Sequence, residues 1–96
     1  MLFILSINYT DQGMRTIKDS PKRARMARET ANKLGANLKE VYLTTGENDL
    51  VAFLEAPNGD VALKFALAMG AQGNIRTKTA RAWTMDEYAK LLEELP

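Results

Sequence analysis

The stretch that decides the fold is NLKEVYLTTGENDLVAFLEA, which runs from Asn37 to Ala56. Two runs rich in strand-forming residues flank a short polar corner, GEN, at residues 46–48. This pattern predicts two antiparallel strands, over residues 37–45 and 49–56, joined as a hairpin. Gly46 and Asn48 are the residues best able to adopt a positive φ at its corner.

A strand and a long helix are predicted on each side of this hairpin. The expected elements are a strand at 2–9, a helix at 20–35, a helix at 57–73, a strand at 74–83 and a final helix at 84–95. Ser20 is suited to cap the first helix, Pro21 to its first position, and Gly35 to its end. Thr84 and Glu87 form the capping box of the final helix.

This order predicts an α+β fold of one domain, residues 1–96, with a ferredoxin-like βαββαβ antiparallel sheet and a C-terminal helix. Right-handed crossovers place both long helices on one face of the sheet. The hairpin strands nevertheless carry apolar groups on both faces, because Tyr42 opposes Val41 and Phe53 opposes Ala52. A monomer seldom exposes such a face, so we expect self-association as a homodimer or a multiple of dimers.

The helix at 57–73 also favours self-association. Lys64 is the only charged residue between Val61 and Met69, and a helix that is apolar nearly all round is buried on more than one side. One sheet does not cover such a helix. Either the C-terminal helix or another chain is expected to do so.

The amino-acid composition excludes several kinds of functional site. The 96 residues include no cysteine and no histidine, and the net charge is +1. A disulfide framework, a thiol nucleophile, a histidine base and imidazole or thiolate metal sites are therefore excluded. No calcium-loop spacing appears, so no metal and no cofactor are expected. The apolar start, MLFILSIN, is short and follows no positive charge; we expect a strand, no membrane partner and a cytoplasmic location.

A nucleic-acid partner is not expected either. The helix between Lys22 and Lys33 is basic, and ferredoxin-like sheets bind RNA when their central strands carry stacking aromatics beside a basic, glycine-bearing motif. Phe53 is the only aromatic residue on the third strand, and no Lys/Arg-Gly-Phe pattern precedes it.

Four segments together resemble the GYD-domain family of small bacterial proteins. They are NYTDQGMRTIKDSPKRA, YLTTGENDLVAFLEAP, KFALAMGAQGNIRTKTARAW and TMDEYAKLLEELP. At the corner, Gly46 and Asp49 match the family's Gly-x-Tyr-Asp pattern, whereas Asn48 stands where tyrosine is usual. The resemblance implies a ferredoxin-like fold akin to the dimeric α+β barrel proteins, and it implies no established reaction.

The candidate site residues form two groups. Thr10 and Asp11 close the first strand, and Asp49 opens the third; each aspartate either belongs to its turn or serves a site. Antiparallel pairing predicts that Asp11 and Asp49 approach each other at one rim of the sheet, beside Thr77 and Thr79. Two carboxylates at close range would raise the pKa of one of them.

The second group lies along the strands. Thr77, Thr79 and Arg81 alternate on one face of the fourth strand, and Tyr42 lies on the second strand. Hydroxyl and aromatic groups on a sheet face line a small-molecule site or, equally, a wet dimer interface.

Two functions remain open. The first is an oligomeric small-molecule-binding or structural module without catalysis. The alternative is a cofactor-independent enzyme of the isomerase or monooxygenase type, by analogy with dimeric barrels. Its acid and base would be drawn from Asp11, Asp49, Tyr42 and Arg81. A cavity between sheet and helices that contains a perturbed carboxylate separates the two hypotheses.

Overall fold

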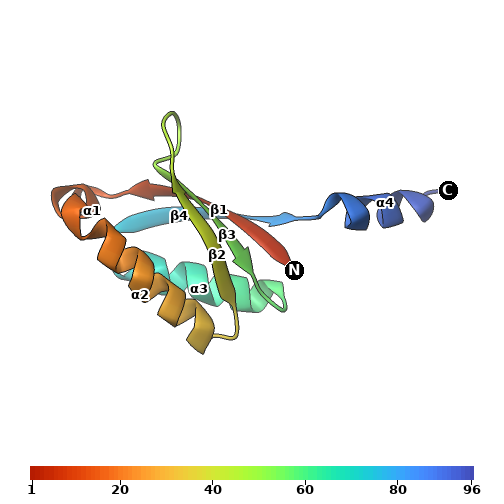
Figure 1. Cartoon of the computed structure of the whole chain (residues 1–96), viewed down its shortest axis with the longest axis horizontal. Helices are drawn as coiled ribbons and strands as arrows, with labels where there is room; N and C mark the ends of the chain where they lie inside the picture. The colour runs from red at the N-terminus through yellow and green to blue at the C-terminus, as the bar shows by residue number, and fades with distance from the viewer.

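A computed structural model describes all residues, 1–96, and arranges the strands in one open sheet. The elements are β1 (Leu2–Tyr9), α1 (Asp11–Arg15), the 3₁₀ helix η1 (Ile17–Asp19), α2 (Ser20–Lys33), β2 (Asn37–Leu43), β3 (Leu50–Glu55), α3 (Gly59–Ala71), β4 (Ile75–Ala82) and α4 (Met85–Glu93). The strand order is β2-β3-β1-β4, and every neighbouring pair is antiparallel. Figure 1 shows α2 and α3 on the same side of the sheet. The predicted α+β, ferredoxin-like fold is confirmed.

The central strand β1 sorts its side chains between two faces. Phe3, Leu5 and Ile7 are at most 6% exposed, whereas Leu2 and Ile4, which alternate with them, are only half-buried. Residues paired across antiparallel strands share a face, so the partners of Phe3, Leu5 and Ile7 on β3 and β4 face α2 and α3 as well. The core therefore lies on one side of the sheet only.

The two long helices contribute unequally to this core. The buried core residues are Phe3, Leu5, Ile7, Ala31, Ala36, Leu38, Ala52, Leu54, Ala56, Ala62, Phe65 and Met69. From α3, Phe65 and Met69 reach the sheet with large side chains. From α2, the fully buried residue is Ala31, with Ala27 packed beside it. Small side chains on α2 leave space between this helix and the sheet.

The opposite side of the sheet, which we call the open face, is covered by no element of the chain. Its central members are Ile4, Tyr42, Val51, Phe53 and Ala80, as the strand register places them. The rings of Tyr42 and Phe53 meet edge-on, with centroids 6.2 Å apart. Next to this apolar centre, β4 presents Arg76 and Lys78 beside Asn8 and Ser6 of β1.

The connector between β1 and α2 contains more structure than its sequence indicates. Thr10 caps α1: its hydroxyl accepts the N–H of Gly13 at 3.1 Å and donates to the carbonyl of Gly73 at 2.6 Å. Gly13 is buried, and a Cβ there would lie 2.0 Å from the carbonyl oxygen of Asn74. Because Gly13 has no side chain, α1 can pack directly against the backbone of Asn74, immediately before β4.

The start of α2 also differs from the prediction, which made Ser20 its N-cap. The helix follows η1 without a break, since Asp19 at the N-cap position has nearly helical dihedrals, φ −84° and ψ −4°. No side chain caps the first turn. Instead, Ser20 is hydrogen-bonded to Tyr9, the last residue of β1.

The turns largely follow the sequence. Gly35 ends α2 with φ +83°, and Gly46 occupies the hairpin corner with φ +102°. Asn48 was expected to share the positive φ, but no residue other than glycine has one. On β2, the pairing with β3 shifts between Leu38 and Glu40, so that Lys39 forms a bulge.

The C-terminal helix α4 projects away from the rest of the molecule (Figure 1). The predicted capping box is present, with Thr84 and Glu87 bonded reciprocally. The helix does not cover α3, whose Leu63 and Leu67 remain 56% and 63% exposed. No helix of the chain has the length and apolar character needed to cross a membrane.

Candidate functional site

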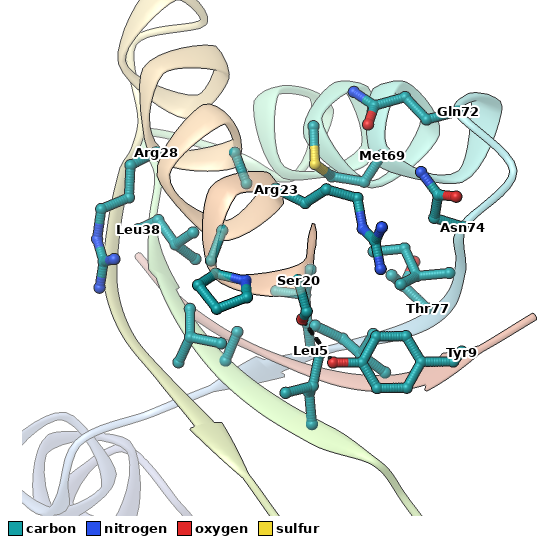
Figure 2. Close-up of a pocket in the computed structure, with 18 of the residues that line it drawn as sticks. Leu5, Tyr9, Ser20, Arg23, Arg28, Leu38, Met69, Gln72, Asn74 and Thr77 are labelled. Carbon is teal, nitrogen blue, oxygen red and sulfur yellow. Dashed lines mark hydrogen bonds between the residues drawn. The ribbon is translucent and has the colours of Figure 1, made fainter. Parts of the chain in front are cut away.

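A cleft of about 600 Å³ lies between α2 and the covered face of the sheet. Its walls are mainly apolar: Leu5, Ile7, Leu38 and Val41 from the sheet, Ala24 and Ala27 from α2, and Phe65 and Met69 from α3. The small side chains of α2 account for the space, because an alanine leaves room that a leucine would fill. Of these residues, Figure 2 labels Leu5 and Leu38 on the sheet and Met69 on α3.

One end of the cleft is polar. The hydroxyl groups of Tyr9 and Ser20 are hydrogen-bonded at 2.7 Å, so the end of β1 is tied to the start of α2. Gln72, Asn74 and Thr77 line the cleft on the same side (Figure 2). A ligand with an apolar body would thus find hydroxyl and amide groups at one end.

Arg23 contributes a positive charge to this polar end. Its guanidinium donates to the carbonyl and the hydroxyl of Thr16, both at 3.0 Å, and to the carbonyl of Gly13 at 3.3 Å. The side chain makes no ion pair with an acid. These contacts orient the guanidinium and leave its charge uncompensated.

All the charged side chains that line the cleft are basic. They are Arg23, Arg25 and Arg28, and no aspartate or glutamate is among the lining residues. Figure 2 places Arg28 beside β2, away from the polar end. The cleft therefore favours an anionic group and holds no carboxylate that would act as a general base.

The structure distributes the predicted site residues over several separate places. Thr77 lines the cleft and, together with Thr79, a second groove between α3 and β4. Thr10 caps α1, and Asp11 is exposed as the first residue of that helix. Tyr42 lies on the open face. The predicted residues do not form one site.

Asp49 joins two strands at the hairpin corner. Its carboxylate accepts the backbone N–H of Tyr9 at 2.9 Å, and its own N–H donates to the carbonyl of Ile7 at 3.0 Å. The same N–H also lies 3.0 Å from the side-chain oxygen of Asn8. No hydrogen bond joins Asp49 to Asp11. These contacts give Asp49 the role of a strand-joining residue.

Arg81 lies at the base of α4. Its guanidinium is 4.4 Å from the ring centre of Trp83, and it forms an ion pair with Glu87 at 3.6 Å. The pKa of Glu87 is lowered from its ordinary value of 4.5, chiefly by the hydrogen bond from the backbone N–H of Thr84, then by hydrogen bonding with the Thr84 side chain and by the charge of Arg81. Arg81 thus orients the C-terminal helix.

Nearly the whole chain matches a known family, including the corner that carries Gly46 and Asp49 and the strands around the cleft. A family model described as the GYD domain matches residues 3–92. The chain belongs to the GYD domain family. A search of curated proteins found no significant match to it. Membership of the GYD family confirms the resemblance seen in the sequence and assigns no reaction.

Local sequence patterns do not single out the residues that make the polar end of the cleft. Tyr9 continues the alternation of Leu5 and Ile7 along β1, which indicates its strand face and not the role of its hydroxyl. Ser20 was assigned to a helix cap, and Arg23 to a basic helix surface. A usable signal was present, because a tyrosine at the end of an otherwise apolar strand face marks the place where that face becomes polar.

Proposed function

We propose that the chain is a non-enzymatic module that binds a small, mainly apolar molecule carrying one acidic group, in the cleft between α2 and the sheet. The single observation that carries the proposal is the lining of the cleft, which is apolar in its body and exclusively basic in its charges. Its volume of about 600 Å³ lies within the usual range of small-molecule sites, roughly 300–1,000 Å³.

The cleft supports an orientation for such a ligand. The apolar body would contact Leu5, Val41 and Phe65, which gives affinity by removing apolar surface from water. The acidic group would lie toward Arg23, where a guanidinium is already held by Thr16. An arginine pre-oriented in this way loses little side-chain freedom when it binds a carboxylate or sulfonate.

The enzyme alternative receives less support from the same cleft. Proton abstraction needs a base within hydrogen-bond reach of the substrate, and none of the lining residues is an aspartate, a glutamate or a histidine. Asp49, the best sequence candidate, is hydrogen-bonded to the backbone of β1. The binding function needs no such group.

Self-association through the open face forms the second part of the proposal. Tyr42 is 53% exposed, and Val51 and Phe53 are only half-buried, so the centre of the open face presents apolar surface to water. A second copy of the chain would cover this surface in the way that packed sheets do.

A pair of matched fluorescent probes tests the binding proposal. 1-Anilinonaphthalene-8-sulfonate carries an apolar body and one sulfonate, whereas N-phenyl-1-naphthylamine has nearly the same body without charge. The charged probe is expected to bind more tightly. Arg23→Gln should abolish this preference, while Lys33→Gln, an exposed change on the same helix that does not line the cleft, should preserve it.

A second pair of variants locates the bound probe. Ala27→Leu adds three carbons inside the cleft, and Ala80→Leu adds the same three on the open face. The proposal requires Ala27→Leu to weaken binding of the sulfonate probe and Ala80→Leu to leave it unchanged. Binding that responds to Ala80→Leu alone would assign the probe to the open face and overturn the proposal.

A further inference from the structure

The helix α4 has an apolar face without a partner in its own chain. The members of this face and their exposed fractions are Met85 75%, Tyr88 48%, Leu91 48%, Leu92 47% and Leu95 65%. Met85, Tyr88, Leu91 and Leu92 recur at spacings of three and four, which places them on one side of the helix, and Leu95 follows the helix end at Glu93. An isolated helix shorter than about 12–15 residues is marginal in water, and α4 has nine residues. Its stability therefore requires another surface.

Contacts at the base of α4 direct it away from its own sheet. Only Trp83 and Thr84 separate β4 from α4. The guanidinium of Arg81 contacts the ring of Trp83 and pairs with Glu87, and the capping box fixes the first turn. With this short, braced connection, α4 leaves along the course of β4 rather than folding back over the sheet (Figure 1).

The charges of α4 match one end of the open face. Asp86 and Glu93 are seven residues apart, so they lie two turns apart on the same flank of the helix. By the strand register, Arg76 and Lys78 lie on the open-face side of β4, at the end that is farthest from α4. Because β4 is an outer strand, Arg76 also borders the groove between α3 and β4. The flank of the helix beside its apolar face carries Asp86 and Glu93 together with Lys90, which lies one turn from each, so it is acidic by one net charge. The open face is basic beside its apolar centre.

Twofold symmetry brings these complementary features together. A twofold axis that crosses the strands reverses their direction in the second copy. The helix α4, which continues the course of β4, then extends toward the beginning of β4 in the other copy, where Arg76 lies. Each copy gives one helix and receives one, so a closed dimer satisfies both surfaces at once.

We infer that α4 is an exchanged arm that lies on the open face of a second copy of this chain, at the end marked by Arg76 and Lys78. The inference rests on the proposed self-association and adds the segment that makes the contact and the place that receives it. The dimer is held by apolar side chains of α4 and selected in its orientation by the flanking acids.

The first test removes the apolar face and keeps the helix. Tyr88→Gln/Leu92→Gln should raise the dimer dissociation constant about 100-fold in analytical ultracentrifugation, since two large side chains no longer become buried. Lys90→Gln/Glu94→Gln places the same residue type on the polar side of α4 and should leave the constant unchanged. Trp83, the only tryptophan, lies at the base of the arm, so its emission should shift on dilution in the wild type and in this control only.

The second test exchanges the charges. Asp86→Lys/Glu93→Lys and Arg76→Glu/Lys78→Glu should each raise the dissociation constant about tenfold. The chain that carries all four substitutions should dimerise again with nearly wild-type affinity. A fourfold variant no better than either pair would refute the placement of α4 at Arg76 and Lys78.

The outcomes distinguish the exchanged α4 arm from self-association through the open face. A wild-type chain that stays monomeric at about 100 µM, a concentration at which even weak specific pairs associate, would refute self-association and the arm together. A stable dimer that is indifferent to Tyr88→Gln/Leu92→Gln would refute the exchanged arm and leave the open-face dimer standing. Circular dichroism shows that each variant is folded before its association is compared.

Discussion

The carboxylate of Asp49, immediately before β3, accepts the backbone N–H of Tyr9, the last residue of β1, at 2.9 Å. The same Tyr9 donates or accepts a hydroxyl hydrogen bond with Ser20 at the start of α2. Tyr9 is thus linked to the hairpin corner on one side and to the cleft on the other. Asp49 contributes to the position of the cleft without lining it.

Asp49→Asn should destabilise the fold without changing its shape. The substitution replaces a charged acceptor by a neutral one, and the free energy of unfolding should fall by about 1 kcal/mol. Urea denaturation measures this loss. Asp11→Asn is the matched control, because the side chain of Asp11 is exposed and accepts no hydrogen bond. Equal stability of both variants would show that Asp49 does not join the strands as described.

Gly13 and Gly70 should respond in opposite directions to alanine. A Cβ at Gly13 would lie 2.0 Å from the carbonyl oxygen of Asn74, so Gly13→Ala should lower the free energy of unfolding by about 1–3 kcal/mol. A Cβ at Gly70 meets nothing within 4 Å, and Gly70→Ala inside α3 should raise it by about 1 kcal/mol. Thermal denaturation of the two variants checks both signs. Tolerance of Gly13→Ala would contradict the close approach of α1 to Asn74.

Tyr9 and Ser20 should be coupled energetically. Tyr9→Phe and Ser20→Ala each remove one partner of the 2.7 Å hydrogen bond, and the double variant removes both. A double-mutant cycle in urea should give a coupling energy of about 1 kcal/mol. Thr30→Ala with Tyr9→Phe makes an uncoupled control pair, since Thr30 is bonded to Met26. A coupling of zero for Tyr9 and Ser20 would show that their hydroxyls do not meet in solution.

The capping carboxylate of Glu87 should make stability depend on pH at the acid end. Its pKa is lowered in the folded chain, mainly by the bond from the Thr84 N–H, so ionised Glu87 favours folding. That contribution is complete above the ordinary pKa of 4.5 and is lost as the pH falls through the lower folded value.

Glu87→Gln isolates this effect, since glutamine still completes a capping box. The wild type should be the more stable of the two near pH 6, and the difference should shrink as the pH falls below 4.5, when unfolding is followed at several pH values. Glu94→Gln changes a carboxylate that makes no side-chain bond and should show no such convergence. A wild-type advantage that grows toward low pH would contradict a lowered pKa of Glu87.

Local signals in the sequence were sufficient to predict most of the fold. Runs of strand-forming apolar residues define β1 and β3, Gly46 defines the hairpin corner, and Thr84 with Glu87 defines the start of α4. Each of these signals involves only a few neighbouring residues, so it can be recognised from a single sequence. The short helix α1 was missed because Gly13 weakens its helical pattern, and the close approach that requires this glycine involves Asn74, far along the chain.

The candidate site depends on long-range geometry and was predicted poorly. The cleft exists because Ala24 and Ala27 of α2 stand over a sheet whose own side chains do not fill the gap. Only the distance between α2 and the sheet reveals this space, and no local pattern encodes that distance. Alternation groups Thr77 with Thr79 and Arg81 on one face of β4 but does not indicate which face meets the helices. The role of Asp49 depends on its bond to Tyr9.

The bulge at Lys39 has a consequence for growth of the sheet beyond one molecule. β2 is an outer strand, and a regular outer strand offers a row of free N–H and C=O groups to any other extended chain. The extra residue at Lys39 interrupts that row, and Lys39 and Glu40 add charge along it. Addition of another strand along β2 is therefore disfavoured, which protects the protein from forming open-ended fibrils through this edge. Association through the open face is not affected.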